Sequence, residues 1–152
     1  MKTQSAATLA GVLLATLALG VPAAARDHSA LNGTWVLVPQ KCEFRGQAAV
    51  QSGTVTIDDR QGNISVLRHF VYDGAGETYF YSDLTDSERN ATIHSGKDIK
   101  SKMRWDHDVL KVTTTQAGAV TVESYTLEPD GSLRVMVVRP EGKAVTLVCQ
   151  RQ

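Results

Sequence analysis

Apolar and polar residues alternate with a period of two along much of the chain. Short runs rich in Val, Ile, Thr and Tyr recur about every ten residues, and turn residues separate them, a pattern typical of β-strands. After residue 25 no stretch repeats its apolar residues with a helical period. The pattern predicts ten strands, at residues 33–38, 53–59, 63–72, 77–82, 89–95, 99–105, 109–116, 119–128, 132–139 and 143–150.

The turns between these strands are short. Residues 128–131 (Glu-Pro-Asp-Gly) and 139–142 (Arg-Pro-Glu-Gly) place proline where its fixed φ suits a type I turn, with a glycine after it. Such connections pair consecutive strands in antiparallel order, and the sheet has exposed edges unless it closes. We therefore predict an all-β domain, a single antiparallel up-and-down barrel of about 8–10 strands. A two-sheet sandwich usually needs longer crossover connections.

Alternation within a strand predicts which side chains face the interior. Lys100, Lys102 and Arg104 share one face of the strand at 99–105, and that charged face must meet solvent. Met103 and Trp105 on the other face are therefore expected to point inward.

The strand at 63–72 is ambiguous. Arg68 shares its face with Phe70 and Tyr72, whereas His69 shares the opposite face with Leu67. One polar side chain must therefore lie on an otherwise apolar inner face.

The first residues predict a segment removed on export. Lys2 precedes an uncharged apolar run at residues 6–21, and three alanines follow before the charged Arg26. Small residues at this point suit a signal peptidase, so we expect cleavage after Ala25, with a signal peptide at 1–25 and one domain at 26–152. The run of about 15 residues is shorter than the roughly 20 that span a bilayer. It has no cysteine at its end for lipid attachment, so we expect a periplasmic or secreted protein with no integral membrane segment after cleavage.

Charge and cysteine content narrow the partners. The sequence has 16 basic and 16 acidic residues, and cleavage removes only Lys2 among them, so nothing indicates a nucleic-acid partner, which needs a strong positive field. Cys42 and Cys149 lie near opposite ends of the mature domain. In an oxidising compartment such an even pair is more often bridged than free, so we expect a disulfide between them.

The segment Leu31-Asn32-Gly33-Thr34-Trp35, a Gly-x-Trp on the first strand followed by a meander of hairpins, resembles the lipocalins and the wider calycin barrels. The resemblance covers most of the mature chain and extends to small exported bacterial lipocalin-like domains. It implies that Trp35 closes the barrel base and packs under an arginine near the end of the last strand, here Arg151.

This pairing conflicts with the disulfide. If Trp35 lies opposite Arg151, Cys42 falls opposite about residue 144, roughly 16 Å from Cys149 at 3.3 Å per residue. A disulfide allows about 7 Å between Cα atoms. Both hold only if Pro39 and Gln40 turn the chain across the barrel mouth.

The candidate ligand-binding residues are the aromatic and polar side chains expected around the interior, namely Arg68, Phe70, Tyr72, Tyr79, Tyr81, Met103 and Trp105. Apolar pockets with a few polar anchors commonly hold small molecules. Arg68 would anchor a carboxylate if its face is the inner one. The alternative is a barrel filled by its own side chains, since about eight strands leave little room.

No motif for catalysis, a metal or a cofactor stands out. The histidines have no zinc-ligand spacing, and no serine sits in a Gly-x-Ser-x-Gly elbow. We expect Glu123 to face outward beside Thr121, the alternative being an inward acid–base pair with His69, as a small isomerase or cyclase would need. We therefore assign no catalytic residue, metal or cofactor.

The sequence thus favours an exported, monomeric barrel that binds a small hydrophobic ligand. The alternative is a protein-interaction module of the same architecture, such as a barrel-type protease inhibitor.

Overall fold

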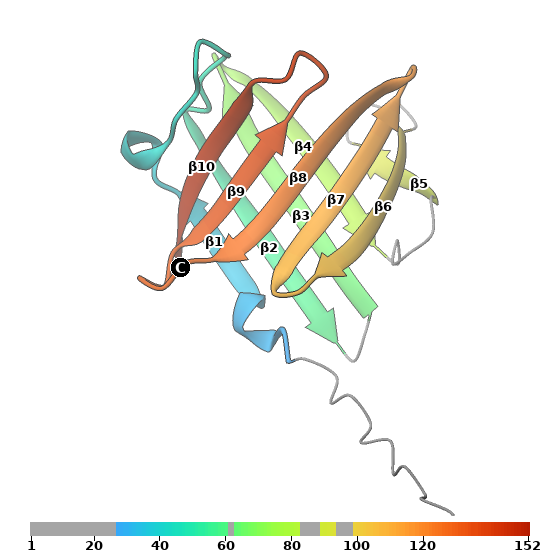
Figure 1. Ribbon diagram of the computed structural model, residues 1–152. Helices are drawn as coiled ribbons and strands as arrows, with labels where there is room; N and C mark the ends of the chain where they lie inside the picture. Colours follow the sequence, from blue (N-terminus) through green and yellow to red (C-terminus); the bar gives the residue numbers. More distant parts are fainter. Residues whose placement is uncertain (1–26, 61–62, 83–88, 94–98) are drawn as a thin grey trace, which may run out of the picture.

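Ten antiparallel strands form a closed barrel in the computed structural model, which describes residues 27–60, 63–82, 89–93 and 99–152 (Figure 1). The expected signal peptide at 1–25, and His94, lie outside the described residues. The strands are β1 (Gly33–Leu37), β2 (Ser52–Arg60), β3 (Asn63–Tyr72), β4 (Ala75–Ser82), β5 (Arg89–Ile93), β6 (Ile99–Asp106), β7 (Val109–Gln116), β8 (Ala119–Leu127), β9 (Leu133–Val138) and β10 (Ala144–Arg151). Short 3-10 helices lie at Ser29–Leu31 (η1) and Pro39–Lys41 (η2).

Each strand pairs with its neighbours in sequence, and β1 also pairs with β10, which closes the barrel. The predicted all-β up-and-down barrel is therefore confirmed, with ten strands in the described part of the chain. Among the described residues, no helix has the length and apolar character needed to cross a membrane.

Two tight turns lie at one end of the barrel. The β3–β4 and β7–β8 connections are two-residue turns, and both central residues have positive φ, 39° at Asp73 and 81° at Gly74, then 49° at Ala117 and 80° at Gly118. Such turns match the natural twist of antiparallel strands. They lie at the same end as the β9–β10 connection and the long segment between β1 and β2, at the top of Figure 1. We call this the open end.

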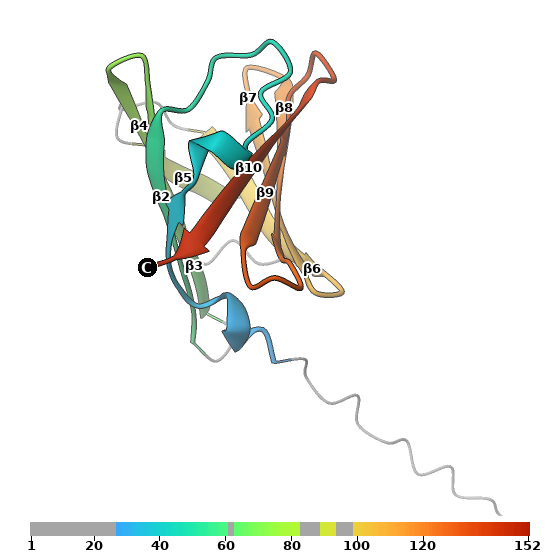
Figure 2. The same ribbon diagram turned by 90° about the vertical axis from the view of Figure 1, so that its left-hand side faces the viewer.

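The opposite end, which we call the base, is closed by Trp35 and Arg151. Trp35 is fully buried, and its Nε1–H donates to the Leu31 carbonyl at 2.9 Å. The Arg151 guanidinium lies 4.3 Å from the centroid of the indole and donates to the carbonyls of Asn32 and Ala30, each at 2.6 Å. Figure 2 shows η1 lying below the strands at this end. The cation–π contact therefore ties β1 to the last strand, and the two hydrogen bonds from Arg151 tie the segment before β1 to it.

Large side chains fill much of the interior. Those that are essentially inaccessible to solvent include Trp35, Ile57, Phe70, Tyr81, Ile99, Met103, Leu110, Tyr125, Leu133 and Leu147. Met103 points inward as the alternation predicts, with Lys100, Lys102 and Arg104 exposed on the other face of β6. The barrel is thus packed through most of its length.

The expected disulfide is absent, because Cys42 and Cys149 are both free thiols. After η2 the chain continues beside β10, where Glu43 bridges to Thr146. The Cys42 thiol, however, donates to the Val38 carbonyl at 3.3 Å and accepts from the Val148 N–H at 3.4 Å. Cys149 points into the core instead.

Neither thiol is in an activating environment. Burial raises the pKa of the Cys42 thiol, and it raises the pKa of Cys149 to about 12, with the nearby Cys42 acting in the same direction. Because the thiolate is the reactive form, both cysteines are poor nucleophiles at neutral pH.

Candidate functional site

Strand β3 turns its arginine into the barrel. Its burial alternates, with Ile64, Val66, Arg68 and Phe70 buried and Leu67 exposed at 42 %. Arg68 itself is only 6 % exposed. The ambiguity in this strand is therefore resolved in favour of the face that carries Arg68.

Strand β8 supplies the opposite charge. Glu123 is 2 % exposed, so the expectation that it faces outward is wrong. The two-residue turn at Ala117–Gly118 sets a register in which Glu123 lies directly opposite Val112. Directly opposite residues share a face of the sheet. Val112 is fully buried, and Glu123 must therefore point inward as well.

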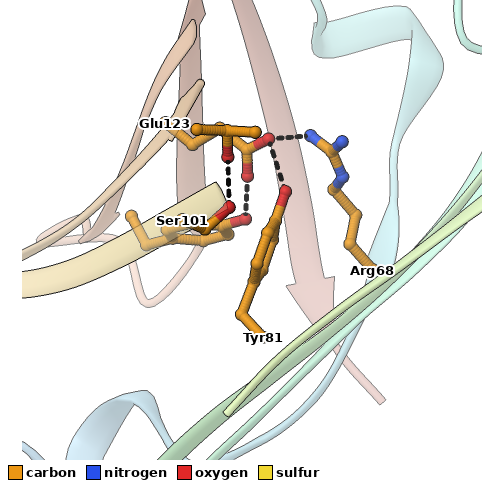
Figure 3. A network of polar contacts seen from close by, with 6 residues as sticks. Arg68, Tyr81, Ser101 and Glu123 are labelled. Carbon is orange, nitrogen blue, oxygen red and sulfur yellow. Dashed lines mark hydrogen bonds and ion pairs between the residues drawn. The ribbon is translucent and has the colours of Figure 1, made fainter. Parts of the chain in front are cut away.

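Arg68 and Glu123 meet across the interior. Arg68 Nη1 donates to Glu123 Oε1 at 2.5 Å, and the hydroxyl groups of two tyrosines complete the carboxylate: Tyr81 donates to Oε1 at 3.3 Å and Tyr125 to Oε2 at 2.5 Å. Figure 3 shows Arg68 and Tyr81 reaching Glu123 from the opposite wall of the barrel. We call these four residues the polar cluster. Every oxygen of its carboxylate has a donor, as a buried charge requires.

Aromatic rings enclose the guanidinium of Arg68. Its Cζ lies 4.3 Å from the ring centroid of Tyr79 and 5.1 Å from that of Phe70. The Nε–H of Arg68 is buried and has no hydrogen-bond partner among the described residues. The cation is therefore held by π-faces and one carboxylate and keeps spare donor capacity.

The electrostatics of the polar cluster follow from burial and pairing. Burial, the largest single effect, lowers the pKa of Arg68, but the Glu123 carboxylate and the neighbouring tyrosines together outweigh it and the net pKa is raised. Burial, together with the charge of Glu123, raises the pKa of Tyr81 and of Tyr125 above the ordinary value. Both phenols are therefore neutral donors at physiological pH and neither is a general base.

A cavity of about 280 Å³ lies beside the polar cluster. Its wall is formed by β3, β4, β7 and β8, by the β7–β8 turn, and by β9 with the residue that follows it. The lining residues are Arg68, Glu77, Tyr79, Tyr81, Thr114, Gln116, Ala117, Ala119, Thr121, Glu123, Val137 and Arg139. These residues place it towards the open end. A second hollow of similar volume shares Glu77 and Arg139 with it and also involves Ala48, Tyr72 and Ala75. At the rim, Arg139 Nη1 donates to Gln47 Oε1.

The cavity wall is more polar than the sequence indicated. Among its lining residues only Ala117, Ala119 and Val137 have wholly apolar side chains. A volume of about 280 Å³ is just below the usual range for pockets that hold drug-sized ligands. The arrangement can hold a small molecule, with Arg68 as donor to it, but it offers no long apolar channel.

No protein-family model and no curated protein matches the sequence. Solved structures match well in shape. They include the REP1-NXSQ fatty acid transporter, with a TM-score of 0.62 at 17 % identity over 80 % of this chain and 96 % of that one. A Schistosoma mansoni fatty acid binding protein in complex with arachidonic acid gives 0.61 at 13 % identity, over 82 % and 98 %. Human cRBP IV gives 0.57 at 17 % identity, over 80 % and 98 %.

The fold is that of a calycin β-barrel. At these identities the likeness establishes the fold alone, and it confirms the lipocalin-like architecture that the Gly33-x-Trp35 segment and the meander of hairpins resemble.

The calycin barrel brings only some of the candidate ligand residues to the cavity. Arg68, Tyr79 and Tyr81 line it, and Tyr72 lines the adjoining hollow. Phe70 and Met103 are buried in the packed core and are not among the lining residues. Trp105 lies at the other end of β6, near the base, where its ring stacks on His28 with centroids 3.6 Å apart.

An acid–base pair of Glu123 with His69 does not exist in this calycin barrel. His69 is exposed on the outer face of β3, where its Nδ1 contacts the Thr78 hydroxyl at 2.8 Å, whereas Glu123 points inward. In the described part of the chain, no three His, Cys, Asp or Glu residues gather as a metal site requires.

Four tyrosines make the barrel sensitive to alkali. The pKa values of Tyr72, Tyr79, Tyr81 and Tyr125 are all raised, chiefly by burial, above the roughly 10 of an unfolded chain. Their contribution to stability is therefore full below about pH 10 and is lost as the pH rises further. We expect tyrosinate absorbance to stay low at pH 10.5 in the folded protein and to rise together with unfolding. The variant Tyr81→Phe should lose stability less steeply as the pH rises. Titration of the tyrosines near pH 10 while the protein remains folded would contradict this account.

Proposed function

We propose that this calycin barrel is a binding protein for a small, partly apolar organic molecule, which it holds in the cavity beside Arg68. The single observation that carries the proposal is that cavity of about 280 Å³, bordered by a buried arginine with unused donor capacity. Only Nη1 of this arginine has a hydrogen-bond partner among the described residues, so an acceptor on a bound molecule would pair with a remaining N–H of the guanidinium.

The apolar part of the molecule has a place as well. Ala117, Ala119 and Val137 lie on the cavity wall, and the ring of Tyr79 borders it. Two of the structurally similar proteins are named for fatty acids: one is a fatty acid transporter, and the other is a fatty acid binding protein in complex with arachidonic acid. They support the use of this fold for apolar ligands, while the smaller and more polar cavity here favours a shorter molecule.

Blocking the cavity tests the proposal. Thr121 lies on its wall, and its neighbour Val120 is 45 % exposed on the outer face of the same strand. Thr121→Trp should weaken binding of a neutral fluorescent probe, N-phenyl-1-naphthylamine, by at least ~10-fold, which corresponds to about 1.4 kcal/mol. Val120→Trp is the matched control and should bind like the unmodified protein.

Fluorescence titration gives the affinities, and circular dichroism verifies that both variants are folded. Equal binding by the two folded variants would show that the probe lies elsewhere. No saturable binding by the unmodified protein would remove the proposal.

We further propose that the barrel acts outside the cytosol, after removal of residues 1–25. The support is the sequence itself, with its cationic start, short apolar run and small residues up to Ala25. An intact mass of the exported protein that begins at Arg26 is expected; a mass that retains Met1 would contradict it.

A further inference from the structure

The polar cluster restricts the charge of the ligand, an inference that rests on the proposed function. Glu123 already receives Arg68 Nη1, Tyr81 and Tyr125 on its two oxygens, at 2.5, 3.3 and 2.5 Å. Its acceptor capacity towards a ligand is therefore largely used. The spare capacity is that of a donor, because Arg68 lines the cavity and only its Nη1 has a hydrogen-bond partner among the described residues. The site is left to bind a hydrogen-bond acceptor.

The positive charge of Arg68 is already neutralised by Glu123. Its guanidinium and the Glu123 carboxylate are 7 % and 2 % exposed and form a buried ion pair at 2.5 Å. At the rim of the cavity, Arg139 and Glu77 add one charge of each sign. The charged residues on the wall are thus two cations and two anions, and the cavity is electrically balanced.

A carboxylate ligand would upset this balance. It would have to leave water and lie near Arg68, within the field of Glu123, and two carboxylates that share a buried site repel each other. The sequence-based expectation that Arg68 anchors a carboxylate depended only on its face being the inner one and did not include the ion pair with Glu123.

We propose that the ligand presents an uncharged acceptor to Arg68, a carbonyl oxygen of an amide, ketone or ester, and that the barrel discriminates against the corresponding carboxylate. An uncharged carbonyl uses the spare donor without adding a second negative charge beside Glu123. The aromatic faces of Tyr79 and Phe70 on the guanidinium are compatible with a neutral neighbour of this kind.

A matched series of ligands tests the inference on the unmodified protein. Octanamide, 2-octanone, octanoate and octylamine have similar apolar chains and differ in the head group. Displacement of N-phenyl-1-naphthylamine at pH 7.5 should show octanamide and 2-octanone binding at least ~10-fold more tightly than octanoate or octylamine. At pH 5 the gap between octanamide and octanoate should narrow, because part of the octanoate becomes the neutral acid.

The variant Glu123→Gln should reverse the preference. It removes the carboxylate but keeps a side chain of the same size, so Arg68 becomes an uncompensated cation and octanoate should gain at least ~10-fold relative to octanamide. If this variant does not fold, the pH series on the unmodified protein still decides.

The outcomes separate the two proposals. Octanoate binding as tightly as octanamide at pH 7.5 overturns the inference and leaves the proposed binding function standing. Failure of both the probe and the whole series to bind overturns the proposed function, and the inference with it.

Discussion

Glu123→Leu is expected to lower the free energy of unfolding by about 3–5 kcal/mol, because it leaves the Arg68 cation buried without its carboxylate. Arg68 is only 6 % exposed, so most of the burial penalty on the guanidinium remains when its carboxylate is removed. Tyr81 and Tyr125 would also lose the oxygen atoms to which they donate. Urea unfolding followed by fluorescence measures the loss.

The double variant Arg68→Met with Glu123→Leu is the control. Replacement of a whole buried ion pair by apolar residues of similar size is often neutral or stabilising, so the double variant should recover most of the stability lost by the single one. A single variant within about 1 kcal/mol of the unmodified protein would show that the ion pair is not the buried contact described here.

Trp35→Ala should also cost about 3–5 kcal/mol. The indole is fully buried, donates to the Leu31 carbonyl and carries the guanidinium of Arg151 on its face. Its removal leaves a cavity at the base, and both the Leu31 carbonyl of η1 and the Arg151 guanidinium of β10 lose their contact with the indole. The midpoint of urea unfolding reports the change.

Trp105→Ala is the matched control for size and chemistry. Trp105 is partly exposed near the same end and stacks on His28, so its loss should cost only about 1–2 kcal/mol. Equal losses at the two tryptophans would contradict the assignment of Trp35 as the residue that closes the base.

The strands could be predicted from the sequence because the turns are local. In the described part of the chain, the predicted ranges agree with the observed strands to within about two residues. Turn sequences such as Pro-Asp-Gly and Ala-Gly specify hairpins without help from distant contacts. Consecutive hairpins leave one closed arrangement, in which β1 meets β10.

Glu123 was missed although the signal was present. The turn at Ala117–Gly118 sets Glu123 opposite Val112, which the alternation of β7 already places inside. Considered without a partner, a carboxylate is unfavourable inside a barrel, and β8 alone therefore favours an outward Glu123. Its burial depends on Arg68, 55 positions earlier in the chain, and no local pattern reveals that partner.

The cavity and the cysteines depend on packing rather than on pattern. The alternation in β6 predicts inward side chains, but whether they leave space depends on how Phe70, Met103 and Tyr125 interdigitate. The turn at Pro39 places Cys42 beside β10. There its thiol accepts a hydrogen bond from the main-chain N–H of Val148 and does not bond to Cys149.

The most direct test of the central claim is to locate a bound ligand on the protein. Two-dimensional amide NMR spectra recorded during titration with octanamide should show saturable shifts concentrated at Ala117, Ala119, Thr121 and Val137, around the cavity. Shifts concentrated at Trp105 and His107 near the base, or no saturable shifts at all, would contradict a binding site beside Arg68 and Glu123.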